Sequence, residues 1–240
     1  MNNKIGVFDS GIGGLTTLKE IRSILPNEDY IYFADSKNNP YGEKTKEELF
    51  NITDNIVKYL INKNVKIIVI ACNTATTNCI NMLRDKYKDM LFVGTEPAIK
   101  VACDNNYKNI LLLATPTTIN SQRTKKLIDN FKKDYQRIYL VACDELANAI
   151  ENNNNEKIDL LLHKYLDQYK DKNIDSIVLG CTHYPIIKKK IKKMFKNATL
   201  VDGNKGVARR VKYLLERNNL LNNQNKKGRV KFIQTKKENT

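Results

Sequence analysis

Two cysteines stand at matching places in the two halves of this 240-residue chain. Cys72 follows the apolar run at residues 67–71, and Cys181 follows the run at residues 176–180. Hydroxyl or amide residues come next and open a helical pattern, which is typical of a strand-to-helix corner in an α/β unit. A pair of thiols facing each other across a substrate could carry a proton away from one side of a carbon atom and deliver one to the other.

A lone cysteine after an apolar strand is most often a small core residue. Three features weigh against this for Cys72 and Cys181: the strand-end position, a helix start whose dipole favours a thiolate, and polar neighbours that a dry core would not accommodate. Cys79, Cys103 and Cys143 lack this setting. We interpret these three as structural thiols, free in a reducing compartment.

His183 lies close after Cys181 and invites a Cys/His nucleophile interpretation. Because neighbouring residues at a helix start point in different directions, we favour proton relay or substrate anchoring for it. The other histidine, His163, lies in an amphipathic helical pattern and is interpreted as a surface residue. With 2 histidines in the chain and no cysteine or carboxylate cluster at ligand spacing around them, we predict no metal site.

A glycine-rich turn follows the first apolar run, at residues 10–14. It fails the dinucleotide fingerprint because Thr16 stands where the third glycine is required. Its backbone N–H groups and the following helix start can still hold a carboxylate, with Asp9 and Ser10 at the strand end. The alternative is a packing turn in which Asp9 caps the helix.

A second turn follows the next apolar strand, where residues 39–42 are Asn-Pro-Tyr-Gly. Proline at the second position is typical of a β-turn, so taken alone the segment is only a turn. As a loop over a substrate, the Tyr41 hydroxyl and the backbone amides, including that of Gly42, could bind an anionic group.

Strand and helix patterns alternate along the chain, which predicts an α/β fold with mostly parallel sheets. The near-repeat of the two cysteine segments predicts two similar α/β domains related by an approximate two-fold axis, with the active site in the cleft between them. The expected strands are residues 5–8, 30–34, 67–71, 91–93, 110–114, 138–141, 176–180, 199–201 and 230–234. The expected helices are residues 15–25, 47–62, 73–86, 118–131, 156–169, 184–195 and 206–217.

The chain is basic, with 41 lysines and arginines against 26 acidic residues and a net charge of +15. The lysines are spread over most helical segments, including residues 188–196, so we interpret them as solvated helix faces and expect no nucleic-acid partner. A basic nucleic-acid or topoisomerase-binding protein remains the alternative of another class. No apolar run has membrane-spanning length and the first residues show no signal-peptide pattern, so we expect a cytoplasmic protein without a membrane partner.

Five motifs, taken together and in order, resemble the successive signatures of bacterial glutamate racemase. They are residues 8–16 (Phe-Asp-Ser-Gly-Ile-Gly-Gly-Leu-Thr), 40–44 (Pro-Tyr-Gly-Glu-Lys), 71–75 (Ala-Cys-Asn-Thr-Ala), 96–98 (Glu-Pro-Ala) and 180–185 (Gly-Cys-Thr-His-Tyr-Pro). Each motif is weak alone, but five in order are highly specific. The resemblance implies a cofactor-independent isomerase that interconverts L- and D-glutamate and supplies D-glutamate for peptidoglycan, and hence for cell-wall biogenesis and cell shape.

The resemblance also implies how the chain is divided. The carboxyl-terminal segment completes the first domain, giving residues 1–96 with 206–240, which carry Cys72, and residues 97–205, which carry Cys181. Members of the family commonly form homodimers, so a homodimer is expected. The sequence departs from the usual pattern at Thr95, where a hydrophobic residue is common, and at residues 201–204, and neither departure touches a predicted catalytic position.

Residue roles follow from the same resemblance. In the L to D direction it assigns Cys181 as the proton acceptor and Cys72 as the donor, with Asp9 and His183 assisting the thiols. Aspartate racemase, which places two cysteines in a related fold, is the runner-up because its substrate is only one methylene shorter. The implied substrate-binding residues are Asp9, Ser10, Tyr41, Gly42, Asn73, Thr74, Thr182 and His183.

Overall fold

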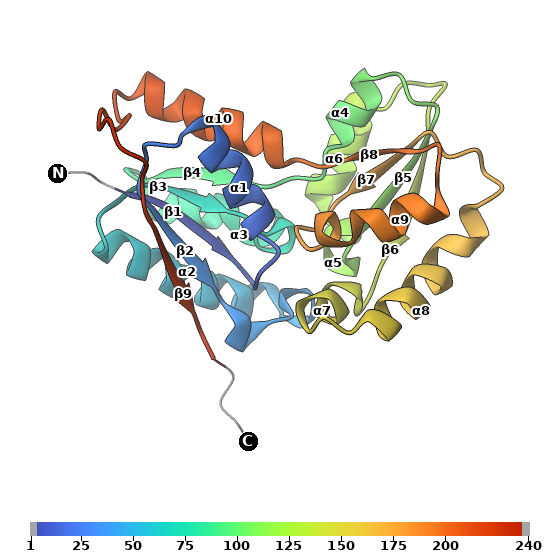
Figure 1. The fold of residues 1–240 in the computed structure, drawn as a ribbon, viewed down its shortest axis with the longest axis horizontal. Coiled ribbons are helices and arrows are strands. Elements are labelled where there is room, and N and C mark those ends of the chain that lie inside the picture. The colour runs from blue at the N-terminus through green and yellow to red at the C-terminus, as the bar shows by residue number, and fades with distance from the viewer. Residues whose placement is uncertain (1–3, 237–240) are drawn as a thin grey trace. The chain divides into compact units, whose positions relative to one another are not determined.

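The computed structural model describes residues 4–236, which divide into two compact units. The chain up to Thr95, together with the part from Asn204 onward, forms the first unit, and Glu96–Gly203 forms the second. Each unit is built on one sheet with helices packed against it (Figure 1). Every described strand pair is parallel, which confirms the α/β fold expected from the alternating strand and helix patterns.

The first unit contains the amino-terminal elements and the last described strand. Its strands are β1 (Lys4–Asp9), β2 (Tyr30–Ala34), β3 (Val65–Ile70), β4 (Leu91–Gly94) and β9 (Val230–Gln234). Its helices are α1 (Leu15–Ile24), α2 (Lys46–Asn62), α3 (Asn73–Lys86) and α10 (Asn204–Arg217), with the short 3₁₀ helices η1 (Ser36–Asn38) and η2 (Tyr41–Glu43). The described strands lie in the order β4-β3-β1-β2-β9.

Both faces of this first sheet are buried. Ile67 and Val69 of β3 pack in a cluster with residues of α1 and α10. Ile68 and Ile70 of the same strand pack on the other side, with residues of α2 and α3. Because side chains alternate along a strand and both faces are covered, the strand has the continuous apolar sequence from which it was predicted.

The carboxyl-terminal strand β9 forms one edge of the first sheet. It pairs in parallel with β2, from Tyr30 opposite Val230 to Ala34 opposite Gln234. In Figure 1 it lies beside β2, and the short final strand expected at residues 230–234 has those bounds.

The second unit repeats the sheet-and-helix plan with its own elements. Its strands are β5 (Asn109–Ala114), β6 (Arg137–Ala142), β7 (Ser176–Leu179) and β8 (Thr199–Val201), in the order β6-β5-β7-β8. Its helices are α4 (Ile99–Asp104), α5 (Pro116–Asn120), α6 (Gln122–Phe131), α7 (Leu146–Glu151), α8 (Asn155–Leu166) and α9 (Lys188–Met194), with the 3₁₀ helices η3 (Asp167–Tyr169) and η4 (Tyr184–Ile187).

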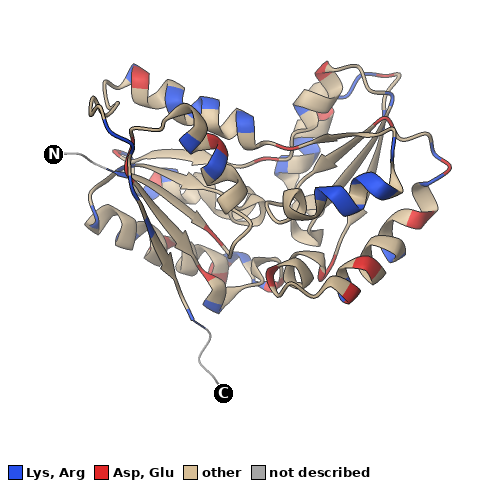
Figure 2. Cartoon of the chain, viewed as in Figure 1, with Lys and Arg blue, Asp and Glu red and all other residues tan. Residues whose placement is uncertain are grey.

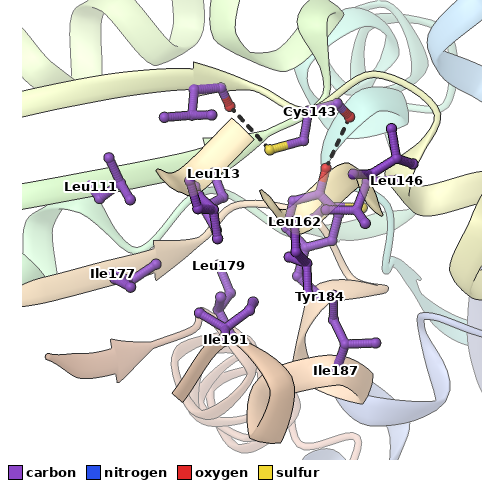
Figure 3. Packing of buried hydrophobic residues seen from close by; sticks show 14 of the residues in the cluster. Leu111, Leu113, Cys143, Leu146, Leu162, Ile177, Leu179, Tyr184, Ile187 and Ile191 are labelled. Carbon is purple, nitrogen blue, oxygen red and sulfur yellow. Dashed lines mark hydrogen bonds between the residues drawn. The ribbon is translucent and has the colours of Figure 1, made fainter. Parts of the chain in front are cut away.

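Helices again cover both faces of the second sheet. Leu111 and Leu113 of β5 pack with α7, α8 and α9, in the cluster drawn in Figure 3. The alternate residues Ile110 and Leu112 pack with α4 on the opposite side.

Two of the expected helices are interrupted. The helix predicted at residues 118–131 is split at Ser121, whose extended backbone ends α5 and whose side chain accepts from Thr124 N–H to cap α6. The helix predicted at residues 184–195 begins as the 3₁₀ helix η4, and α9 follows only from Lys188. The sequence analysis missed α4 and α7, because six residues are too few to display a 3.6-residue periodicity.

Charged residues are distributed over the helices of both units (Figure 2). Lysines and arginines appear on α1, α9 and α10, and acidic residues stand among the basic ones on several other helices. This spread fits solvated helix faces. None of the helices in the described part of the chain combines the length and apolar character needed to span a bilayer.

Candidate active site

In the first unit, candidate residues gather at the carboxyl ends of adjacent strands. Asp9 is the last residue of β1, and Cys72 follows β3, which pairs with β1. Tyr41 reaches the same region from η2. All three are buried. Burial raises the pKa of Tyr41 well above its ordinary value, with additions from Asp35 and smaller ones from the nearby Cys72 and Asp9.

Cys72 lies at the amino terminus of a long helix. It is the N-cap residue of α3, and the backbone N–H of Ala75 donates to its Sγ at 3.5 Å. A donor and a helix amino terminus both stabilise negative charge on sulfur. The next residues, Asn73 and Thr74, are also buried, and Asn73 Oδ1 has no hydrogen-bond partner within residues 4–236.

The glycine-rich turn after β1 holds the Asp9 side chain. Asp9 Oδ2 accepts from the backbone N–H of Gly11 at 3.2 Å and of Gly14 at 3.0 Å. Two amides that the sequence analysis offered to a substrate carboxylate are therefore bound to Asp9 itself, so that expectation was wrong for these two donors. Ser10, next along the chain, is buried beside them.

Gly14 is required where it stands. A Cβ atom there would lie 2.7 Å from Asp9 Cβ and 2.8 Å from the Tyr32 hydroxyl oxygen. That hydroxyl donates to the Gly11 carbonyl at 2.7 Å. The glycine thus allows the turn to fold tightly over the ends of the strands, which fixes the position of Asp9.

The Tyr41 hydroxyl has a partner that the sequence analysis did not anticipate. It donates to Asp35 Oδ2 at 2.8 Å, and both side chains are buried. In this arrangement the hydroxyl can only accept a hydrogen bond from a substrate. It therefore suits an ammonium group and not the anionic group expected from the sequence. Gly42 follows Tyr41 in η2.

In the second unit, the site centres on Cys181, which follows β7. His183 Nδ1 lies 3.8 Å from Cys181 Sγ, and His183 Nε2 lies 2.7 Å from Glu151 Oε2. The side chains of His183 and Glu151 are only 2% and 11% exposed. The sequence analysis favoured proton relay or substrate anchoring for His183 and did not require it to touch this thiol. The turn that follows Cys181 brings the imidazole to the sulfur.

Glu151 is the functional residue that sequence reasoning missed. It is the last residue of α7, and from the sequence it is one acidic residue beside a run of asparagines. A neutral imidazole that donates through Nε2 to this carboxylate has an acceptor at Nδ1, where it can take a proton from the thiol. The thiol, the imidazole and the carboxylate therefore stand in contact, one after the other. His163, by contrast, is exposed and contacts Asp167.

The two thiol corners differ in their local structure. Cys72 is followed at once by α3, but Cys181 is followed by a short turn and then by η4, with Pro185 in its first turn. The predicted α-helix start is therefore found at Cys72 and was wrong at Cys181, where the 3₁₀ helix η4 comes first and α9 begins only at Lys188. Cys72 Sγ thus accepts from a helix amide, whereas Cys181 Sγ lies against the imidazole of His183.

Buried contacts hold the second corner in place. Gly180 N–H donates to the Leu113 carbonyl at 2.7 Å, and a Cβ at Gly180 would lie 2.8 Å from that same oxygen. Tyr184 donates to the Cys143 carbonyl at 3.3 Å, as Figure 3 shows. Thr182, which stands between Cys181 and His183 in the sequence, is also buried.

The remaining cysteines have the properties of structural thiols. Burial raises the pKa of Cys143 to about 12, with an addition from the nearby Cys181. Burial likewise raises the pKa of Cys79 to about 11 and shifts that of Cys103 upward. Such thiols stay protonated at neutral pH. Across residues 4–236, no three His, Cys, Asp or Glu side chains group in a way that could hold a metal ion.

The Asp/Glu/Hydantoin racemase model matches residues 18–211, most of the chain. The chain belongs to this family. It is 44% identical over 236 residues to the glutamate racemase of Clostridium botulinum (strain Alaska E43), covering 97% of this chain and 91% of that protein. It is 43% identical over 233 residues to the glutamate racemase of Clostridium novyi, covering 95% and 90%.

Solved structures of the racemase family share this fold. The glutamate racemase of Francisella tularensis, solved in complex with D-glutamate, is 35% identical, with a TM-score of 0.84 over 98% of this chain and 89% of that one. A glutamate racemase isoform of Bacillus anthracis is 28% identical, with a TM-score of 0.85 and the same coverage. The match extends over both units, so the racemase family is shown for the whole fold.

Proposed function

We propose that this protein interconverts L- and D-glutamate, with Cys72 and Cys181 as the two groups that transfer the α-proton. The observation that carries the proposal is the pair of strand-end thiols, each in polar contact with groups that stabilise a thiolate. Ala75 N–H donates to Cys72, and the His183–Glu151 pair lies against Cys181. The names of relatives at about 40% identity support glutamate as the substrate.

Two proton carriers are needed because one group would return the proton to the face from which it came. In the L to D direction, the Cys181 thiolate removes the α-proton and becomes a thiol. The Cys72 thiol delivers its proton to the opposite face of the α-carbon and becomes a thiolate. The electron pair left by the first transfer forms the new C–H bond, so nothing is oxidised or reduced. The reverse reaction exchanges the two roles.

The other residues hold the substrate and stabilise charge. Between turnovers in the L to D direction, His183, in contact with Glu151, accepts the proton of Cys181. Asp9 assists the return of a proton to the Cys72 thiolate, so that the starting protonation states are restored. The buried Asn73 Oδ1, 4% exposed at the residue level and unpartnered within the described chain, fits the substrate ammonium. Fixed donors favour the carbanion-like transition state without reorganisation. Ser10, Gly42, Thr74 and Thr182 bind the two carboxylates of the substrate.

We extend the proposal to the protein's setting. The enzyme works in the cytoplasm without a cofactor, as a homodimer, and supplies D-glutamate for peptidoglycan. The relatives named glutamate racemase support this role. Light scattering of the purified protein measures its oligomeric state, and a monomer at micromolar concentration would exclude the homodimer.

Solvent exchange tests the reaction. L-Glutamate incubated with the purified protein in D₂O should yield D-glutamate, with deuterium at the α-carbon of both enantiomers. L-Aspartate under the same conditions should react far more slowly, and a faster reaction with aspartate would replace the substrate assignment. Cys72→Ser and Cys181→Ser should each lower kcat by about 100-fold or more, because a positioned acid or base contributes about 10²–10⁴-fold. Folded protein that labels neither enantiomer of glutamate would refute the proposal.

A further inference from the structure

We propose that Thr235, the residue that follows β9, positions the loop that carries Tyr41 and Gly42, through its hydroxyl and the buried Asp35 carboxylate. The inference rests on the proposed function only in taking this loop to bind substrate. Thr235 and Asp35 are positioning residues, because neither is assigned contact with the substrate.

Thr235 is bonded three times to the segment that begins the loop. Its Oγ1 donates to Asp35 Oδ1 at 2.9 Å and accepts from Lys37 N–H at 2.9 Å. Its own backbone N–H donates to the Ala34 carbonyl at 3.0 Å, which continues the ladder between β9 and β2. The hydroxyl is therefore used both as donor and as acceptor, and both of its partners belong to the segment at residues 35–37.

Asp35 connects Thr235 to Tyr41 through one carboxylate. Its Oδ2 accepts from the Tyr41 hydroxyl at 2.8 Å, and both of its oxygens accept from Asn38 Nδ2, at 2.9 and 3.1 Å. The residue is only 2% exposed. The buried carboxylate thus accepts from three neutral side chains, those of Thr235, Asn38 and Tyr41. If the Thr235 hydroxyl is lost, one carboxylate oxygen loses a donor, and we expect the loop to shift as the remaining donors rearrange.

The far end of this connection lies at the candidate site. Tyr41 is buried in one cluster with Phe8, Leu49 and Cys72. Asp35 N–H also donates to the Asp9 carbonyl at 2.9 Å, which ties the loop to the end of β1. A single side chain, that of Asp35, therefore connects Thr235 to Tyr41, which belongs to the same buried cluster as Cys72.

The rest of β9 offers controls for the test. Gln234 Nε2 donates to Ser36 Oγ at 3.0 Å, so it fastens the same strand end without touching Asp35. The Phe232 ring stacks on Tyr32, with centroids 5.5 Å apart, and Tyr32 contacts the glycine-rich turn. Truncating the strand would remove several of these contacts together, so single substitutions at residues 234 and 235 make the sharper experiment.

Steady-state kinetics test the positioning role. Thr235→Val keeps the shape and removes the hydroxyl, and we expect kcat/KM for glutamate to fall about 10-fold, mainly through a higher KM, since a hydrogen bond to a charged group is at stake. Thr235→Ser restores the hydroxyl and should stay within about twofold of the wild type, as should Gln234→Leu. Unchanged kinetics in Thr235→Val, or an equal loss in Gln234→Leu, would overturn the inference.

Hydrogen–deuterium exchange gives a readout independent of catalysis. In the ligand-free protein, amides at residues 36–44 should exchange faster in Thr235→Val than in Thr235→Ser or the wild type. If the wild type does not racemise glutamate, the proposed function fails, while this measurement still decides whether the hydroxyl holds the loop. Equal exchange in all three proteins would overturn the inference, and so would faster exchange without a change in KM in an active enzyme.

Discussion

The carboxylate of Glu151 provides the sharpest test of the relay at Cys181. It lies 2.7 Å from His183 Nε2 in a nearly buried pair. Glu151→Gln keeps the size of the side chain but removes the charge that stabilises an imidazolium. A hydrogen bond to a charged group contributes about 1.5–3 kcal/mol, and the amide retains part of it. We therefore expect a loss of about 2 kcal/mol of transition-state stabilisation, or about 30-fold in kcat/KM.

The direction of the effect can be measured as well as its size. L- and D-glutamate have equal free energies in water, so kcat/KM must fall equally in both directions. The α-deuterium isotope effects on the two enantiomers need not change equally, because Glu151 acts only on Cys181. Slower transfer at Cys181 should enlarge the isotope effect on L-glutamate, whose proton Cys181 removes, and reduce that on D-glutamate.

Circular dichroism follows the racemisation, with α-deuterated substrates supplying the isotope effects. Glu156→Gln, an exposed glutamate in the first turn of α8, is the matched control and should keep wild-type kinetics. Wild-type activity in a folded Glu151→Gln protein would refute the relay. An enlarged isotope effect on D-glutamate instead would reverse the assignment of the two thiols.

Three further substitutions test stability. Gly14→Ala should lower the free energy of unfolding by about 1–3 kcal/mol and reduce activity, because its Cβ would lie 2.7 Å from Asp9 Cβ. Gly206 lies in α10, and nothing lies within 4 Å of a Cβ added there, so Gly206→Ala should instead raise the free energy of unfolding by up to about 1 kcal/mol. Urea denaturation measures both variants. A Gly14→Ala protein as stable as the wild type would contradict the packing argument. At Asp54, burial alone would raise the pKa, but hydrogen bonds from two lysines and Tyr87 lower it from 3.8 to about 2. Because the folded pKa lies below the unfolded one, its stabilisation is complete above about pH 4 and is lost as the pH falls toward 2. Because both lysines are about half exposed and solvent screens the pairs, Asp54→Asn should cost about 1 kcal/mol at pH 7 and little near pH 2. A loss independent of pH would contradict the ion-pair explanation.

The sequence by itself determined the strands and most of the longer helices, but not the short helices α4 and α7. Runs such as residues 67–71 and 110–114 are apolar throughout because both faces of each sheet are covered, and that pattern is local. The runs at residues 67–71 and 176–180 placed Cys72 and Cys181 at the corners that follow them. A short final strand at residues 230–234 was likewise evident from its own residues.

Only the tertiary structure decided which side chains meet at those corners. His183 and Glu151 are 32 residues apart, and Thr235 and Asp35 are 200 apart. No periodicity within a helix or strand encodes such pairs, because they form only when packing brings distant ends of parallel elements to one edge of a sheet. Strand order and the partners of the candidate residues therefore belong to the folded chain, while strand and helix identity were already carried by its local pattern.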